Sequence, residues 1–165
     1  MSADNQSCPL CNPKPEDILF DTHNFYLMAS KSTSDIIIIP KKHYPTMADI
    51  PDEINPEFDD LRRLVRKVLN VDFSECVFYE HTGGDHTRAF IGHGEGHGHA
   101  HIHFSPKGHE LLEKIPDAHI REVDSWKELT ASRRDGEQYF YIEDNGNKKF
   151  VIMIDDVRHL LEEGI

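Results

Sequence analysis

Short apolar runs bounded by turn residues recur along the chain and predict a fold rich in β-strands. Residues 24–28 and 75–80 combine aromatic and aliphatic side chains, and residues 35–39 are Asp35 and four isoleucines that end at Pro40. β-branched and aromatic runs of this length favour strands, and a proline ends them because it has no N–H for the ladder. We therefore expect three strands in the first half of the chain.

The last third of the chain carries the pattern of a β-hairpin. Residues 138–143 and 149–154 are two apolar runs that flank Asp144-Asn-Gly-Asn147. An Asn-Gly pair between such runs is typical of a tight hairpin turn. Residues 156–163 follow as a short predicted helix.

One segment has the period of a helix instead of a strand. Proline and acidic residues stand at the start of residues 56–69, as they commonly do in the first helical turn. Apolar side chains then recur three and four positions apart, which predicts a helix with one buried face. These side chains are Phe58, Leu61, Leu64, Val65, Val68 and Leu69.

Histidines and aliphatic residues alternate strictly over residues 99–104. This alternation predicts a strand in which His99, His101 and His103 share one face and Ala100, Ile102 and Phe104 the other. Residues 83–98 precede it and hold six of the ten glycines of the chain, which predicts a loop with unusual backbone angles.

Composition narrows the class of protein. A chain of 165 residues, 38% hydrophobic and 29% charged, suits one compact globular domain. The net charge of −12 argues against general nucleic-acid binding, since such proteins concentrate lysine and arginine. No apolar run approaches the roughly 20 residues of a membrane helix, and no secretory signal is visible. With three cysteines, we expect a reducing, cytoplasmic location.

The histidine content calls for a chemical explanation. Six of twelve histidines fall between His93 and His109. An imidazole can act as nucleophile, as general acid or base, or as metal ligand. Two plainer interpretations stand beside these: a solvated histidine-rich strand, and a tract that only chelates metal.

The spacing of residues 99–106 resembles the signature of the histidine-triad (HIT) superfamily of nucleotide hydrolases and transferases. Residues 35–43, 47–50 and 78–83 are also similar to segments of that family, and the hairpin with residues 156–160 looks like a C-terminal extension found in some members. The resemblance implies an α+β fold with an antiparallel sheet, one main helix and a C-terminal hairpin-helix extension. We expect a HIT-like catalytic domain over residues 1–110 and the extension over residues 111–165.

The resemblance implies catalysis through a covalent nucleotidyl-histidine. His101, the middle residue of the row, would be the nucleophile that attacks an α-phosphate, and His103 would contact phosphate or leaving group. The bond cleaved would be a phosphoanhydride or phosphoramidate, in dinucleoside polyphosphates or nucleoside phosphoramidates. The glycine loop, including Gly94 and Gly96, could present backbone N–H groups to phosphate, although glycine runs are also simple flexible connections.

A second site is suggested by Cys8-Pro-Leu-Cys11, which has the spacing of a zinc knuckle. Zinc-containing relatives imply that His43 and His99 complete the ligand set, with zinc in a structural role. A redox pair or two ordinary thiols are the alternatives.

Three positions depart from the family pattern. Asp35 stands where many members have a fourth histidine, and Glu95 where they have a polar residue, often glutamine, near the phosphate. Ser30 lies in place of the ribose-binding Asp or Asn. Asp35 and Glu95 favour a second hypothesis, a non-catalytic nucleotide-binding HIT scaffold. A third hypothesis is a histidine-rich zinc-binding protein, in which the histidines are metal ligands at open sites. The resemblance also implies a homodimer.

Overall fold

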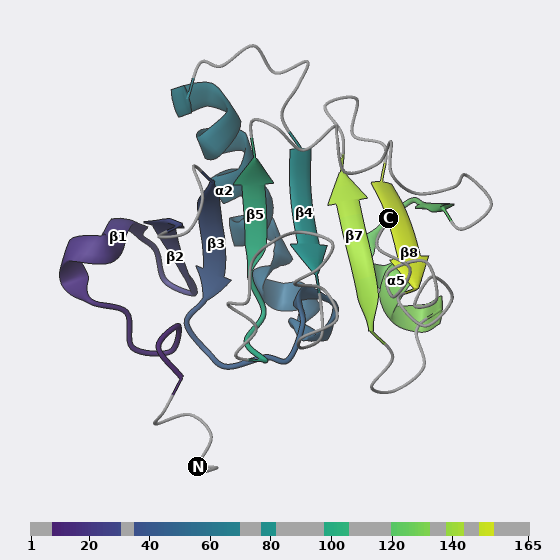
Figure 1. Ribbon diagram of the computed structural model, residues 1–165, viewed down its shortest axis with the longest axis horizontal. Coiled ribbons are helices and arrows are strands. Elements are labelled where there is room, and N and C mark those ends of the chain that lie inside the picture. The colour runs from purple at the N-terminus through teal and green to yellow at the C-terminus, as the bar shows by residue number, and fades with distance from the viewer. Residues whose placement is uncertain are drawn as a thin grey trace, which may run out of the picture.

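One antiparallel sheet organises the computed structural model, which describes residues 8–30, 35–69, 77–81, 98–105, 120–132, 138–143 and 149–153. Eight strands lie in the order β1-β2-β3-β5-β4-β7-β8-β6, and neighbouring strands run antiparallel (Figure 1). The strands are β1 (Ile18–Asp21), β2 (Phe25–Ala29), β3 (Ile36–Pro40), β4 (Val77–His81), β5 (Ile102–Ser105), β6 (Arg121–Val123), β7 (Tyr139–Glu143) and β8 (Lys149–Met153).

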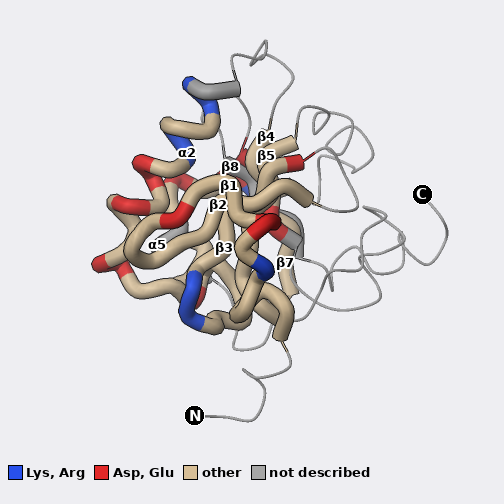
Figure 2. Tube along the Cα trace, turned by 90° about the vertical axis from the view of Figure 1, so that its left-hand side faces the viewer, with Lys and Arg blue, Asp and Glu red and all other residues tan. Residues whose placement is uncertain are grey.

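One long helix, α2 (Asn55–Leu69), covers one face of this sheet. Its buried residues Phe58, Leu61 and Val65 pack in one core with strand residues that include Ile38 and Phe104. The α+β class with an antiparallel sheet and one main helix, predicted from the sequence, is confirmed. Figure 2 shows that acidic and basic residues follow the outer side of α2, as its amphipathic pattern predicts.

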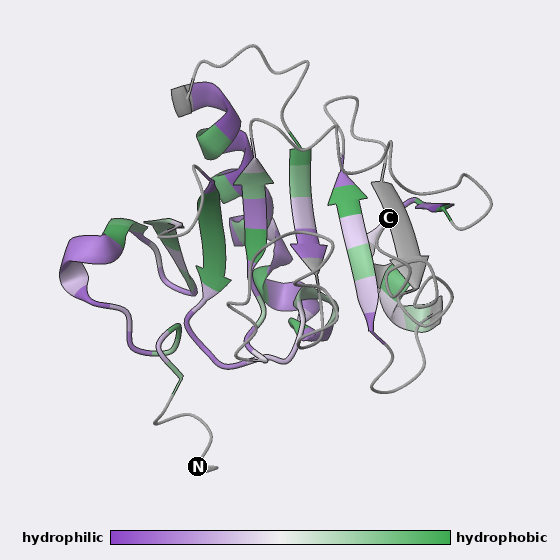
Figure 3. Ribbon diagram, in the orientation of Figure 1, coloured by the Kyte–Doolittle hydropathy of each residue, from purple (hydrophilic) through white to green (hydrophobic). Residues whose placement is uncertain are grey.

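The opposite face of the sheet carries a second, smaller apolar cluster. Cys8 and Leu10 pack there against Met28, Ile37 and Ile39. β3 is a continuous apolar run and is buried on both faces. β5 is buried as well, but it alternates in hydropathy because His103 lies between Ile102 and Phe104 (Figure 3). The N-terminal segment is therefore fixed on the sheet face away from α2.

The predicted strand over residues 99–104 is wrong at its start. β5 begins at Ile102, because the preceding residues bond to a loop instead of the ladder. The N–H of Ala100 donates to the carbonyl of Tyr44 at 2.7 Å, and the ring of His99 contacts the carbonyl of Pro40. The alternation of faces still holds, since Ala100, Ile102 and Phe104 lie in the core beside α2.

Strands β7 and β8 form the hairpin predicted from the sequence, with Glu143 opposite Lys149. β7 pairs with β4, so the hairpin continues the same sheet. The Asn-Gly turn, the predicted helix 156–163 and the boundary proposed at residue 110 lie outside the described residues, and the division into two regions stays a prediction.

The buried carboxylate of Glu143 joins this hairpin to α2. Arg62 and Arg66 both pair with Glu143, the Arg66 contact at 2.8 Å, and the hydroxyl of Tyr141 donates to the same side chain at 3.1 Å. Glu143 is fully buried. A buried carboxylate of this kind requires such partners, since an unpaired charge in the interior is strongly unfavourable.

The sequence interpretation missed helix α5 (Trp126–Ser132) and the short edge strands β1 and β6. A signal for α5 is present in Ser125-Trp-Lys-Glu128. The hydroxyl of Ser125 accepts from the N–H of Glu128 at 3.2 Å, as the N-cap residue of a capping box does. The Glu128 carboxylate accepts from the N–H of Asp124, one residue before Ser125, at 2.7 Å. No helix in the part of the chain that the structure describes is long and apolar enough to cross a membrane.

Candidate functional site

Four predicted metal ligands come together at the end of β3. Cys8, Cys11, His43 and His99 each offer one ligand atom, and these atoms all lie within 4.8 Å of one another. Nδ1 of His99 lies 3.3 Å from Sγ of Cys8 and 3.4 Å from Sγ of Cys11, and Nδ1 of His43 lies 3.2 Å from Sγ of Cys11. The cluster therefore has the composition and size of a site that could hold a metal ion.

The donor set and spacing fit zinc. Bond lengths of about 2.0–2.3 Å around a tetrahedral zinc put its nitrogen and sulfur ligands about 3.3–3.8 Å apart, close to the sulfur–nitrogen distances here. Two thiolates with two imidazoles form a closed shell of four protein ligands, the arrangement of structural zinc sites.

His99 is held in the tautomer that a metal ligand needs. Its Nε2 lies 2.8 Å from the carbonyl oxygen of Pro40, so Nε2–H donates there and the lone pair of Nδ1 faces the cysteines. Burial lowers the pKa of His99 to about 4, which keeps the ring neutral. A backbone carbonyl of β3 thus orients a ligand 59 positions further along the chain.

The Cys11 thiol is protonated in the absence of a metal ion. Burial, followed by the neighbouring Cys8, raises the pKa of Cys11 to about 11. Because metals bind the thiolate, metal binding at this cluster must release a proton from Cys11.

Gly98 leads the chain into the site. Its φ is +61°, in the left-handed region that favours glycine, and His99 follows directly. The residues that follow Gly98 lie against residues 40–44, through the contacts of Ala100 with Tyr44 and of His99 with Pro40.

His101 is the second histidine of the row, and the backbone determines its tautomer. Its Nδ1 lies 2.8 Å from the carbonyl oxygen of His99, so Nδ1–H donates to that carbonyl and the basic lone pair is on Nε2. The side chain is 4% exposed. A neutral imidazole with a fixed Nδ1–H is the form in which Nε2 can attack an electrophile.

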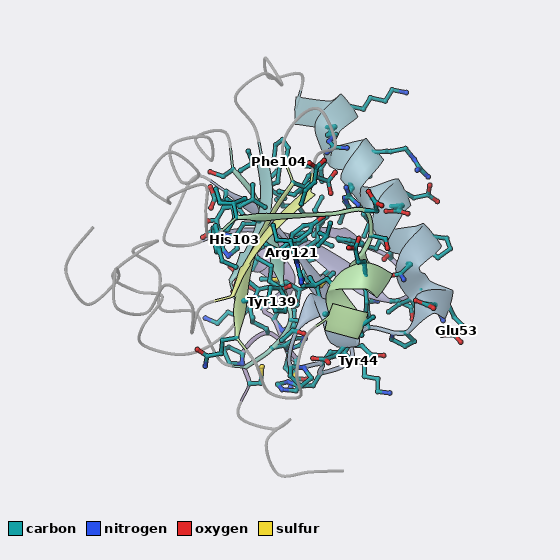
Figure 4. All side chains as sticks on the ribbon, turned by 90° about the vertical axis from the view of Figure 1, so that its right-hand side faces the viewer. Tyr44, Glu53, His103, Phe104, Arg121 and Tyr139 are labelled. Carbon is teal, nitrogen blue, oxygen red and sulfur yellow. The ribbon has the colours of Figure 1, made fainter. Side chains whose placement is uncertain are left out.

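His103 lies on the face of β5 away from α2 (Figure 4). Its ring faces the carboxylate of Asp35. Its Nδ1 is 3.2 Å from Oδ2 of Asp35, and the hydroxyl of Tyr79 donates to the same oxygen at 2.7 Å. The rings of Tyr79 and His103 stack, with centroids 4.6 Å apart and planes 11° from parallel. The His101 and His103 rings are 5.1 Å apart, so one phosphoryl group could contact both.

Asp35 is ionised in this setting. Its burial alone would raise the pKa, but hydrogen bonds with His103, Tyr79 and Ser105 outweigh burial and lower the pKa below its usual value of 3.8. The sequence marked Asp35 only as a departure from a family pattern. The sequence analysis did not identify Tyr79 as a site residue. The alternation of β4 is the signal, because it places Tyr79 on the other face of the sheet from the core residue Phe78.

The predicted substrate-binding residues are only partly within the described part of the structure. Gly94, Glu95 and Gly96 lie outside it. Ser30 follows β2, and its N–H donates to the carbonyl of Asp35 at 2.9 Å, which closes the connection between β2 and β3. Its role toward a nucleotide stays a prediction.

A hollow of about 240 Å³ lies on the helix side of the sheet, lined by residues of η2 (Met47–Asp49), η3 (Asp52–Ile54) and α5 among others. None of the histidines in the row lines it. We therefore assign the candidate chemistry to the row and not to this hollow.

Several solved structures are similar to this chain. A histidine triad protein from Clostridium difficile is similar to this chain. The two share 22% sequence identity and superpose with a TM-score of 0.46, over 63% of this chain and 90% of the other. No family profile and no curated protein matches the sequence.

Proposed function

We propose that this chain is a nucleotide hydrolase or nucleotidyltransferase of the histidine-triad type. In this proposal, Nε2 of His101 attacks the α-phosphorus of a nucleotide and forms a covalent nucleotidyl-histidine. Water or a second acceptor then resolves the intermediate. The observation that carries the proposal is the hydrogen bond between Nδ1 of His101 and the carbonyl of His99, because it selects the nucleophilic tautomer.

His103 would stabilise the reaction from the neighbouring position. Its ring is 5.1 Å from that of His101 and its Nδ1 faces a carboxylate. Hydrogen-bond donors aimed at developing negative charge commonly contribute roughly 3 kcal/mol each to transition-state stabilisation. Phosphoanhydrides and phosphoramidates of nucleotides are the substrate classes proposed here.

The metal cluster would have a structural role in this function. Zinc at Cys8, Cys11, His43 and His99 would tie the N-terminal segment to the chain two residues before the nucleophile. Thiolate ligands persist in a reducing compartment, so the proposal includes a cytoplasmic location. The homodimer implied by the resemblance is retained as part of the proposal and is tested by light scattering.

The decisive experiment is to trap the intermediate. The chain is mixed with a nucleotide radiolabelled at the α-phosphate and quenched in alkali, in which a phosphohistidine survives. We expect label on wild-type protein and none on His101→Ala, whose turnover should be abolished. Imidazole should partly rescue His101→Gly. Full turnover by His101→Ala would refute the mechanism.

One observation favours a second candidate, a nucleotide-binding scaffold without turnover. His101 is 4% and His103 is 1% exposed, so both rings contact little solvent. A nucleotide bound at the surface would then lie apart from the two imidazoles. Calorimetry with AMP, run beside a product assay on the same preparation, separates the two candidates. Binding without product supports the scaffold.

A further inference from the structure

We infer that Asp35, supported by Tyr79, is a positioning residue that orients His103 as the proton donor to the leaving group. The site would consequently prefer nucleotides whose leaving group must be protonated, such as amines and alcohols. This inference rests on the proposed function and adds a substrate preference to it.

The first support is geometric. The Asp35 carboxylate lies at the start of β3, His103 on the adjacent β5, and Tyr79 on β4 on the other side of β5. Oδ2 of Asp35 receives the Tyr79 hydroxyl at 2.7 Å and faces Nδ1 of His103 at 3.2 Å. The stacked Tyr79 ring restricts rotation of the imidazole. With Nδ1 held toward Asp35, Nε2 is the nitrogen left to face the reacting groups.

The second support is the contrast between the two imidazoles. Nδ1 of His101 faces a neutral backbone carbonyl, which selects a tautomer without adding charge. Nδ1 of His103 faces a carboxylate instead, and the two form an ion pair when the ring is protonated. Asp35 and His103 are 4% and 1% exposed, so little solvent screens the pair. The backbone thus sets the tautomer of His101, whereas Asp35 places a negative charge beside His103.

Among the described residues, Asp35 just before β3, Tyr79 on β4 and the His101 ring face His103. Of these three groups, Asp35 supplies negative charge as a carboxylate. Hydrogen bonds lower the pKa of that carboxyl despite its burial, so it is ionised at neutral pH.

The proposed reaction has two steps, formation of the nucleotidyl-histidine and its hydrolysis. The lone pair of His101 Nε2 forms a bond to phosphorus while the bond from phosphorus to the leaving nitrogen or oxygen breaks. The bonding pair goes to that leaving atom, which takes the proton from His103 Nε2. Water then attacks phosphorus, the P–N bond returns its pair to His101, and the proton lost by water returns to His103.

This step predicts dependence on the leaving group. An amine or alcohol leaves poorly without a proton, whereas nitrophenolate leaves as a stable anion. General acid catalysis typically contributes 10²–10⁴-fold, and only the poor leaving group needs it. Loss of Asp35 should therefore slow cleavage of substrates with an amine or alcohol leaving group and leave cleavage of nitrophenyl esters nearly unchanged.

The test compares two substrates of one nucleotide: an alkylamine phosphoramidate and a p-nitrophenyl ester. For Asp35→Asn we expect kcat/KM to fall about 100-fold on the phosphoramidate and less than about threefold on the nitrophenyl ester. Tyr79→Phe is a milder change, and its kcat/KM should fall about tenfold on the phosphoramidate alone. Asp21→Asn, at an exposed carboxylate on β1, serves as the control and should match wild type on both.

Equal losses on both substrates would overturn the inference, because a merely structural defect does not distinguish leaving groups. No loss on the phosphoramidate would overturn it as well. If Asp35→Asn fails to fold, the Tyr79→Phe comparison decides alone by the same criterion. Failure of the proposed function is seen separately, as turnover that persists in His101→Ala on both substrates.

Discussion

The carbonyl oxygen of His99 lies 2.8 Å from Nδ1 of His101. A predicted metal ligand therefore orients the predicted nucleophile through its own backbone. The His99 ring is in turn held between the carbonyl of Pro40 and the two cysteines. Order at the metal cluster and order at the nucleophile are consequently linked through His99, whose ring belongs to the cluster and whose carbonyl accepts from His101.

Removing the metal should lower activity as well as stability. We expect Cys8→Ser, or chelation of the wild-type protein, to reduce kcat by about 10- to 100-fold, the usual effect of losing an outer contact that orients a reacting group. The assay is run at a temperature where circular dichroism shows the protein folded, and zinc added back to chelated protein is the control. Full activity in metal-free protein would contradict the link.

Metal binding should release protons. Because burial raises the pKa of Cys11 to about 11, its thiol is protonated at neutral pH and must lose a proton to bind zinc. Titration calorimetry in two buffers of different ionisation enthalpy measures the number released. We expect at least one per zinc, and Cys11→Ser should release fewer. An equal heat in both buffers would contradict the assignment of Cys11 as a thiolate ligand.

Glu143→Gln should destabilise the fold strongly. It leaves Arg62, which is 8% exposed, beside a neutral partner, and breaking a buried ion pair from one side typically lowers the free energy of unfolding by roughly 3–5 kcal/mol. Urea denaturation measures the change. Arg63→Gln is the matched control, because the Arg63–Asp60 pair is exposed and should change stability by less than about 1 kcal/mol. Similar effects of the two variants would show that the buried pair is not a special contributor.

Asp35→Asn should alter the acid dependence of stability. The folded-state pKa of Asp35 lies below its usual value of 3.8, so its contribution is present above that value and is lost as pH falls through the folded pKa. The difference in unfolding free energy between wild type and Asp35→Asn should thus be largest near neutral pH and shrink below about pH 4. Thermal unfolding followed from pH 7 to pH 3 tests this. A difference that stays constant with pH would show that the carboxylate charge does not contribute.

Much of the fold followed from local patterns. The isoleucine run of β3, the amphipathic α2 and the hairpin strands are each visible in a few consecutive residues, because burial on one or both faces imposes a period on the sequence. The edge strand β1 was not predictable in this way. Leu19 and Phe20 remain 57% and 49% exposed there, so no burial pattern marks it.

The metal ligands could also be predicted from the sequence. Cys8 and Cys11 have a recognisable spacing, and His43 and His99 came from a resemblance that could be matched residue by residue. Their distances to one another, by contrast, exist only because the N-terminal segment packs on the far face of β3.

The sequence by itself determined which residue types were available: a row of alternating histidines, a cysteine pair and a strand-rich chain with one long helix. The groups that surround each imidazole depend instead on the fold. His101 faces a carbonyl two residues away, while His103 faces Asp35, which is 68 positions distant. Strand order and register bring β3 beside β5, and the charge around an imidazole depends on such spatial neighbours and not on the residues next to it in the chain.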